Sequence, residues 1–178
     1  MENTTSPSPA KIGVNYGLLL GIILILISVV MYVTGMAYEG KQWPMYIYYV
    51  IFPVVIIFGI KNYKAENNTY LSLSEALKVG VLIGVISGII FLIYNLIFNY
   101  IIEPDFGEQM IEISRNQMAE AGTLTEEQIE MSIGWVRWMT NPFLGGAIWI
   151  AMSAFFALIY ALIAGLVMKK ENPYTAQG

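Results

Sequence analysis

The sequence contains no cysteine and no histidine, and only 12% of its 178 residues are charged. The absence of cysteine excludes disulfides, thiol nucleophiles and thiolate metal sites. The absence of histidine removes the most common general base and the imidazole ligands of zinc and haem. No phosphate-binding loop, dinucleotide fingerprint or nucleophile elbow is present either. We therefore expect that the protein is not an enzyme and that it holds no cofactor or metal ion.

What the sequence has instead is hydrophobic residues, which make up 57% of the chain. They are concentrated in four long stretches without any charged side chain. About 20 consecutive apolar residues cross a bilayer as a helix, because each residue rises ~1.5 Å against a hydrocarbon layer of ~30 Å. The sequence thus predicts an all-α, polytopic membrane protein whose first partner is the lipid bilayer. Its four transmembrane helices are expected at about residues 13–37, 43–60, 76–102 and 141–168.

The four spans leave room for a single domain, at residues 11–170. Residues 1–10 are polar and rich in proline, which predicts a disordered tail, and residues 171–178 form a second short tail. The first apolar stretch is about twice as long as the ~7–15-residue core of a signal peptide. Because only Lys11 precedes it as a basic residue, we expect it to remain as a span.

The basic residues predict how the protein is oriented in the membrane. Lysine and arginine near the ends of spans favour the cytoplasmic side. Four spans place both termini on the same side, and this side carries six of the nine basic residues: Lys11, Lys61, Lys64, Lys78, Lys169 and Lys170. The other side carries only Lys41, Arg115 and Arg137. We therefore expect both termini in the cytoplasm.

The segment between the third and fourth spans is the only long part of the chain expected outside the membrane. Its sequence predicts an extracytoplasmic helical hairpin at about residues 105–139. Asp105 and Thr125 each have an acid or amide three residues later, which is the spacing of a capping box. Gly122 between the two helices is a natural helix stop. We expect the apolar faces of these helices to rest on the outer end of the bundle or in the membrane interface.

Three glutamates of the second hairpin helix, Glu126, Glu127 and Glu130, share its charged side. One interpretation is a carboxylate cluster for calcium or for acid–base chemistry. No calcium-loop spacing is present, and a solvated helix face explains the same pattern more simply. Because eight acids face only two arginines in the whole segment, the three glutamates are also a possible surface for a basic partner.

Two sets of residues in the third span are candidates for helix packing. Gly80, Gly84 and Gly88 form two consecutive GxxxG steps, which let a neighbouring helix approach closely. Asn95 and Asn99 continue the same face and are expected to form hydrogen bonds with a facing helix. Packing within one bundle explains both sets best. Contact between copies in a homo-oligomer and a polar step in a transport route are the alternatives.

Three segments carry a resemblance to a known family: KIGVNYGLLLGI, LSLSEALKVGVLIGVISGIIFLIYNLIFNYIIEPDF and ALIYALIAGLVMKK. Their hydrophobic runs are punctuated by Asn15, Glu75, Lys78, Pro104 and the last two lysines. With this pattern the chain resembles the bacterial membrane family called domain of unknown function 4199, from Lys11 to about Lys170. The resemblance implies a four-helix, multi-pass protein of the bacterial inner membrane. It implies no established activity and no catalytic residues.

Several functions are compatible with these features. The first is a non-enzymatic accessory, scaffold or interaction subunit that binds another membrane protein or a second copy of itself. The alternative is a small transporter or channel, which would have to be oligomeric because four short helices enclose little pore. An intramembrane enzyme, a sensor and a lipid-binding protein are further possibilities. Nucleic-acid binding is not expected, because the chain has no basic patch.

Overall fold

The computed structural model describes residues 7–39 and 43–172. Most of the two expected tails, 1–10 and 171–178, lies outside these residues, as does Lys41. Within the described residues the chain is almost wholly helical, and the expected all-α class is confirmed. The elements in order are α1 (Pro9–Val33), α2 (Trp43–Glu66), α3 (Leu73–Ile97), the π-helical turn η1 (Phe98–Ile102), α4 (Phe106–Ala121), α5 (Glu126–Thr140) and α6 (Pro142–Met168).

Four of these helices, α1, α2, α3 and α6, are long and apolar enough to cross a membrane, as expected. Helix α3 continues into η1, so this candidate span runs from Leu73 to Ile102. Helix α1 ends at Val33, earlier than expected, because the chain then turns through Gly35, which has a φ of 75°. Helix α2 continues through Pro53 and past the expected end at residue 60, as far as Glu66.

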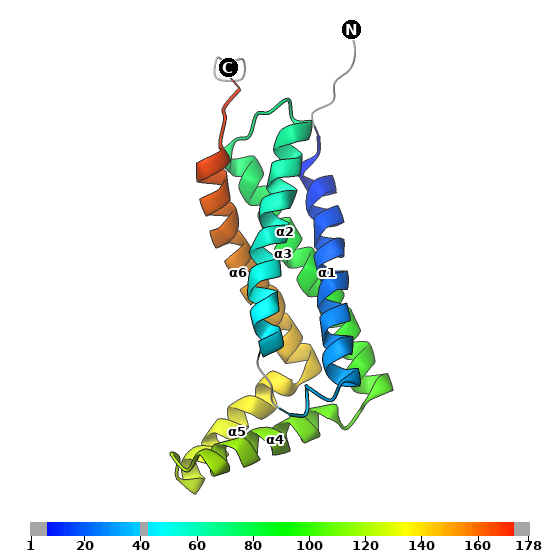
Figure 1. Cartoon of the computed structure of the whole chain (residues 1–178), viewed down its shortest axis with the longest axis vertical. Helices are drawn as coiled ribbons and strands as arrows, with labels where there is room; N and C mark the ends of the chain where they lie inside the picture. Colours follow the sequence, from blue (N-terminus) through cyan, green and yellow to red (C-terminus); the bar gives the residue numbers. More distant parts are fainter. Residues whose placement is uncertain (1–6, 40–42, 173–178) are drawn as a thin grey trace.

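The long helices form one bundle around α3, which packs most extensively against α6 and α1 (Figure 1). Helix α2 contacts all three of the other long helices, but less extensively. The beginning of α1 and the end of α6 lie at the same end of the bundle, which we call the terminal end. The hairpin of α4 and α5 lies at the opposite end, the hairpin end, and projects obliquely from the bundle axis.

The glycine stripe of α3 lies at its contact with α6. A Cβ atom added to Gly84 would lie only 2.6 Å from the Cβ atom of Ala157 and 2.7 Å from the carbonyl oxygen of Ser153. A Cβ atom on Gly80 would collide with the Cβ atom of Ala161 in the same way, and one on Gly88 would press on α6 as well. Small residues on both helices therefore bring the two backbones into close contact, as in other GxxxG packings.

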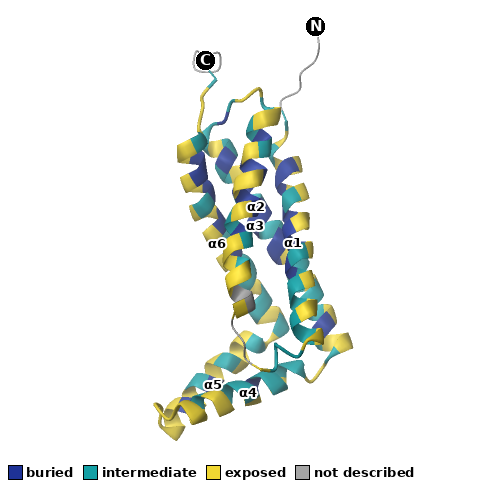
Figure 2. Ribbon diagram, in the orientation of Figure 1, coloured by how far each residue is buried: buried dark blue, intermediate teal, exposed yellow. Residues whose placement is uncertain are grey.

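The buried core is concentrated in the half of the bundle next to the terminal end, here called the terminal half. In α1 the last buried residue is Leu24, and in α3 the last one is Gly88. In α6 the first buried residue is Ser153, so none occurs in the turns before it. The half next to the hairpin, the hairpin half, consists mostly of half-buried and exposed side chains (Figure 2). The two halves of one bundle are thus packed differently.

The terminal end is fastened by contacts that the sequence patterns did not suggest. Leu71, just before α3, pairs with Lys170, just after α6, through two backbone hydrogen bonds of 2.8 and 2.9 Å. The Nζ atom of Lys64 donates a 2.6 Å hydrogen bond to the carbonyl oxygen of Met168. These bonds tie the loop between α2 and α3 to the end of α6, so that the ends of three helices are joined.

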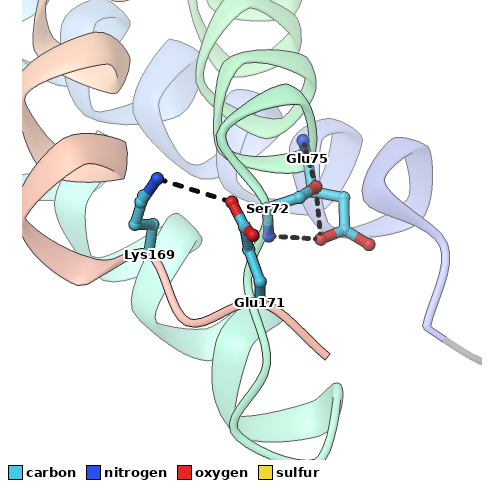
Figure 3. Close-up of polar contacts among 4 residues, drawn as sticks. All are labelled: Ser72, Glu75, Lys169 and Glu171. Atoms are coloured by element: carbon cyan, nitrogen blue, oxygen red, sulfur yellow. Dashed lines mark hydrogen bonds and ion pairs between the residues drawn. The ribbon is translucent and has the colours of Figure 1, made fainter. Parts of the chain in front are cut away.

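A complete capping box starts α3 at this end (Figure 3). The backbone N–H of Ser72 donates to the Glu75 carboxylate over 2.7 Å, and the backbone N–H of Glu75 donates to the Ser72 hydroxyl oxygen over 3.3 Å. The second carboxylate oxygen of Glu75 accepts a 2.8 Å bond from the Tyr63 hydroxyl of α2. The same close-up shows Lys169 paired with Glu171, just beyond α6. The capping box therefore also holds α2 against α3.

The helix boundaries of the hairpin agree with two of the three predicted signals. The capping box at Thr125 is complete, and Gly122 has the left-handed conformation of a helix stop, with a φ of 63°. Asn141 caps α6, whose first residue is Pro142. The capping box expected at Asp105 is wrong, because its backbone is already helical, and its side chain forms no capping hydrogen bond.

Candidate functional site

Two adjoining hollows open in the hairpin half of the bundle, and the larger one continues past Ser153 into the terminal half. Together they form the candidate site. The smaller one, the polar cavity, has a volume of about 210 Å³ and lies where α3 and η1 meet the beginnings of α4 and α6. Its polar lining comes from Asn95, Asn99, Thr140 and Asn141. None of the described residues that line it is charged. The cavity can therefore offer hydrogen bonds to a ligand but no ion pair.

Asn95 and Asn99 both face the polar cavity, but their amide groups bond within their own helix. The Nδ2 atom of Asn95 donates a 3.1 Å hydrogen bond to the carbonyl oxygen of Phe91, and that of Asn99 donates a 2.9 Å bond to the carbonyl oxygen of Asn95. Each amide thus bonds one turn back, whereas the sequence suggested bonds to a facing helix. This geometry places the two side chains on the wall of a cavity and not at the glycine contact.

The larger hollow, the aromatic groove, has a volume of about 370 Å³ and lies between α2 and α6. Its floor includes the buried residues Phe52 and Ser153. Its rim includes Tyr49, Met152 and Phe156, which are exposed on the outer surface of the bundle. Because α2 and α6 are candidate spans, this surface is one that would face lipid.

Trp149 separates the two hollows, since its side chain lines both of them. Its ring lies 5.2 Å from that of Tyr48 on the groove side and 5.6 Å from that of Phe91 on the cavity side, measured between ring centroids. The indole Nε1–H is buried and has no hydrogen-bond partner among the described residues. A buried donor without a partner costs free energy, so this atom would gain from an acceptor.

A second polar cluster lies where α1 meets the hairpin. The Tyr32 hydroxyl donates a 2.7 Å hydrogen bond to one carboxylate oxygen of Glu103, and the Gln109 amide donates a 3.3 Å bond to the other. Burial raises the pKa of the nearby Tyr38, and the negative charge of Glu103 raises it further. Through its hydrogen bond with Tyr32, Glu103 joins α1 to the connection between η1 and α4.

The hairpin has a small core of its own. Ile111 of α4 packs with Ile129 and Ile133 of α5, and all three are buried. Arg115 of α4 forms a two-pronged ion pair with Glu130 of α5, one prong measuring 3.2 Å between Nη2 and Oε2. The Arg115 guanidinium lowers the pKa of the Glu130 carboxyl group, and the carboxylate raises the pKa of Arg115 in turn. The two helices are therefore joined by both apolar and ionic contacts.

Helix α5 presents two further faces besides the one that packs on α4. One carries the exposed Glu126 next to the paired Glu130, while Glu127, also exposed, stands one turn before Met131 at the edge of the second face. The three glutamates of the sequence prediction thus differ in role, because Glu130 already bridges the hairpin. The other face carries an exposed apolar stripe: Met131, Trp135, Trp138 and Met139, which are 67%, 65%, 46% and 61% exposed. An exposed stripe of this kind is unusual for a water-facing surface.

The described residues contain no group of three or more carboxylates that could hold a metal ion. No nucleophile next to a base occurs among the side chains that line the two hollows. The chemistry available there is hydrogen bonding and contact with aromatic rings.

Residues 15–170 match the family described as "Protein of unknown function (DUF4199)". The chain belongs to this family. The resemblance seen in the sequence is thereby confirmed over most of the chain. No curated protein and no solved structure matches the chain. Membership thus identifies relatives of the chain without assigning it an activity.

Sequence reasoning missed the aromatic groove, although part of the signal was present. Tyr48 and Phe52 are four residues apart in the second span, and Trp149, Phe156 and Tyr160 share one face of the fourth. These spacings place aromatic rings on one face of each helix. They do not reveal that the two faces lie opposite each other, because helix pairing depends on contacts between distant segments.

Proposed function

We propose that this DUF4199 protein is a non-enzymatic, multi-pass protein of the bacterial inner membrane that acts as an accessory or interaction subunit. In this proposal both termini lie in the cytoplasm, and the α4–α5 hairpin faces outward and binds a partner protein. The observation that carries the proposal is the hairpin itself. It has its own buried core, it is cross-linked by ion pairs, and it projects from the bundle with an acidic face exposed.

The distribution of the basic residues supports this orientation. The terminal end of the bundle carries the lysines at the ends of α2 and α6, and two of them, Lys64 and Lys170, are fixed by hydrogen bonds. The hairpin end carries Arg115 and Arg137, and both are paired with glutamates of the hairpin. Orientation follows the number of lysines and arginines near the ends of the spans, and acidic residues contribute little to it. The excess of basic residues at the terminal end therefore supports a cytoplasmic position of that end.

The exposed stripe of α5 supports a position of the hairpin at the membrane surface. Helix α5 ends at Thr140 and α6 begins at Pro142, so the two helices meet at the level where the last span starts. Tryptophan is enriched at this level, because its ring is apolar and its N–H is polar. With Trp135 and Trp138 in the headgroup layer, Glu126 and Glu130 are directed away from the lipid chains, and Glu127 lies at the border between the two faces near the hairpin tip, so the acidic side is available to a partner.

The packing of the terminal half argues against transport by a single copy. Ile56, Ile60, Tyr63, Val79 and Ile83 fill this half of the bundle, and each is at most 1% exposed. A continuous route for a solute would have to pass through this core. A transporter would therefore need several copies, and the proposed interaction subunit needs only one.

The orientation can be tested with single cysteines, because the natural chain has none. We expect Gly122→Cys, at the tip of the hairpin, to react with a membrane-impermeant maleimide in intact cells. Asn67→Cys, in the loop between α2 and α3, should react only after the inner membrane has been permeabilised. The reverse pattern would contradict the proposed orientation.

The partner can be sought with a photo-crosslinking amino acid at position 127, in cells that express the protein at its natural level. We expect a discrete protein adduct whose yield falls as salt is raised, since charge attraction is screened over ~8 Å at physiological ionic strength. Glu126→Gln should reduce the yield further. The matched control places the probe at Ile22, an exposed residue in the middle of α1 that would face lipid. Equal adducts at both positions, or none at position 127, would contradict the proposal.

A further inference from the structure

We propose that the aromatic groove and the polar cavity together bind one amphipathic membrane lipid. Its hydrocarbon chain occupies the groove between α2 and α6, and its uncharged, hydroxyl-bearing head occupies the cavity. This site does not include the partner surface on the hairpin. The proposal of lipid binding can therefore be tested separately from the proposed function. The two hollows adjoin, since Met139, Gly145 and Trp149 line both of them.

The groove has the length and depth of a lipid chain. It follows α6 from Gly145 to Tyr160, a distance of about 22 Å at ~1.5 Å per residue. One leaflet contributes about half of a hydrocarbon core of ~30 Å. The groove thus begins at the membrane surface where α6 starts, extends through one leaflet and ends beyond the middle of the bilayer. A chain that lies parallel to the neighbouring lipid chains can enter it from the side.

The lining of the groove selects hydrocarbon over water. Aromatic rings and methionines predominate, and the few polar groups are the hydroxyls of tyrosine and Ser153 and the indole of Trp149. An empty apolar hollow loses dispersion contacts on its whole lining, and water does not enter a space that offers it too few partners. In a bilayer the molecule that is present at this depth is lipid, so a chain fills the groove.

The polar cavity specifies the head. The amide nitrogens of Asn95 and Asn99 already donate to backbone carbonyls, and no hydrogen bond among the described residues occupies their side-chain oxygens. These two oxygens can therefore accept hydrogen bonds, and hydroxyl groups of a ligand can donate them. No charged side chain lines the cavity itself, and the nearest charges, Glu108 and Arg137, line an adjoining open hollow and pair with each other. A phosphate or an ammonium group would therefore be buried in the cavity without a counter-charge of its own. The head that fits is small, uncharged and rich in hydroxyls.

Trp149 lies at the junction between chain and head. Its Nε1–H has no partner among the described residues. In a glycerolipid an ester carbonyl lies between the hydrocarbon chain and the head. Its oxygen can accept the hydrogen bond that the Trp149 indole N–H can donate. A diacylglycerol-like lipid thus complements the chain groove, the unpartnered indole and the two asparagine oxygens.

The test uses the fluorescence of Trp149 in a variant in which the other three tryptophans are phenylalanine. The protein is held in phosphatidylcholine nanodiscs, and diacylglycerol with brominated chains is added as the quencher. We expect quenching that saturates at one lipid per protein. Brominated phosphatidylglycerol, which is charged, should quench at least tenfold less at the same concentration.

Two matched variants separate this site from ordinary contact with lipid. Ile148→Phe fills the groove and should weaken saturable quenching at least tenfold, whereas Leu162→Phe, on the exposed surface of α6 outside the groove, should leave it unchanged. Asn95→Leu with Asn99→Leu should remove the preference for diacylglycerol over phosphatidylglycerol. Quenching that rises linearly and equally in all variants would mean contact with surrounding lipid only and would overturn the proposal. Equal saturation by the charged lipid would overturn it as well.

Discussion

In the terminal half of the bundle, glycine and alanine bring α3 against α6, whereas in the hairpin half large aromatic side chains stand between α6 and α2 and leave two hollows. The same helix takes part in both arrangements. Ala157 and Ala161 of α6 meet the glycines of α3, and Trp149, a few turns away, lines both hollows. Helix α6 thus changes from a packing element to the wall of a site along its own length.

This difference reflects how helices associate in lipid. Hydrocarbon tails are as apolar as leucine, so burial of apolar area does not by itself hold helices together in a membrane. Close backbone approach through small residues does so, through dispersion and interhelical hydrogen bonds. The half with the small residues therefore supplies most of the stability. The hairpin half has fewer such contacts, Gly146 of α6 against Leu92 of α3 being one, and it buries fewer side chains. It is therefore freer to open and to accommodate another molecule, as regions with few buried contacts generally are.

The largest effect is expected from Gly84→Leu. The new side chain would press on the carbonyl group of Ser153, which is backbone and cannot move aside, so we expect a loss of about 3 kcal/mol. The same substitution at Gly134 of α5, where a Cβ atom meets nothing within 4 Å, should be neutral or stabilising. Thermal unfolding in detergent measures both. Similar losses in the two variants would show that the glycine stripe is not a close contact.

A smaller difference in the free energy of unfolding is expected between Ile60→Ala and Ile148→Ala. Ile60 is fully buried in the terminal half, and its truncation leaves a cavity that costs about 2 kcal/mol. This cost is at the low end of the range for soluble proteins. In a membrane the lipid tails are as apolar as the protein core, so removing buried apolar area loses less free energy than it does in water. Ile148 borders a groove that is already hollow, so its truncation should cost well under about 1 kcal/mol. If Ile148→Ala were the more damaging variant, the contrast between the halves would be reversed.

Helix caps at the two ends of the protein offer the next comparison. Ser72→Ala removes one half of a capping box that also holds Tyr63 of α2 through Glu75, so the bundle should lose about 1 kcal/mol. Thr125→Ala removes the corresponding box of α5, whose two hydrogen bonds join only Thr125 and Gln128. It should loosen the first turn of the hairpin helix and leave the melting temperature of the bundle unchanged. Amide hydrogen exchange of α5 and thermal melting of the whole protein distinguish the two results.

The smallest effect concerns pH at the hairpin. The Arg115 guanidinium lowers the pKa of Glu130 in the folded protein, so this pair contributes stability above the unfolded pKa of about 4.5 and loses it as pH falls through the folded value. We expect faster amide exchange in α4 and α5 at pH 3.5 than at pH 7, after correction for intrinsic rates. Glu130→Gln should make this pH dependence weaker. An unaltered pH dependence in that variant would show that other carboxyl groups cause it.

Much of the fold can be predicted from the sequence because its signals are local. Long uncharged stretches define the four apolar helices, and Gly122, Thr125 and Asn141 mark helix ends by their own backbone and side-chain chemistry. The capping box of Ser72 and Glu75 has the same local signature, a serine three residues before a glutamate at the start of an apolar run, but it is not among the predicted helix starts. Asp105 has the same spacing, but the chain enters its helix through a turn that is already helical.

The site is less predictable because it depends on which helices face each other. Asn95 and Asn99 were recognised as unusual in an apolar span, but their bonds to their own helix and their position on a cavity wall follow from the placement of α4 and α6. Glu130 was assigned to an exposed face, and only the register of the hairpin reveals its ion pair with Arg115. The contact between Leu71 and Lys170 likewise joins segments that are distant in sequence.

The most direct test of the contrast between the two halves is a pair of distance measurements between spin labels. Because the chain has no cysteine, labels can be placed on exposed residues without other changes, at Tyr46 and Phe143 in the hairpin half and at Phe58 and Val167 in the terminal half. Both pairs join α2 and α6. We predict a narrow distance distribution in the terminal half and a broad one in the hairpin half that narrows when diacylglycerol is added. Equally narrow distributions in both halves, without any response to the lipid, would contradict the account.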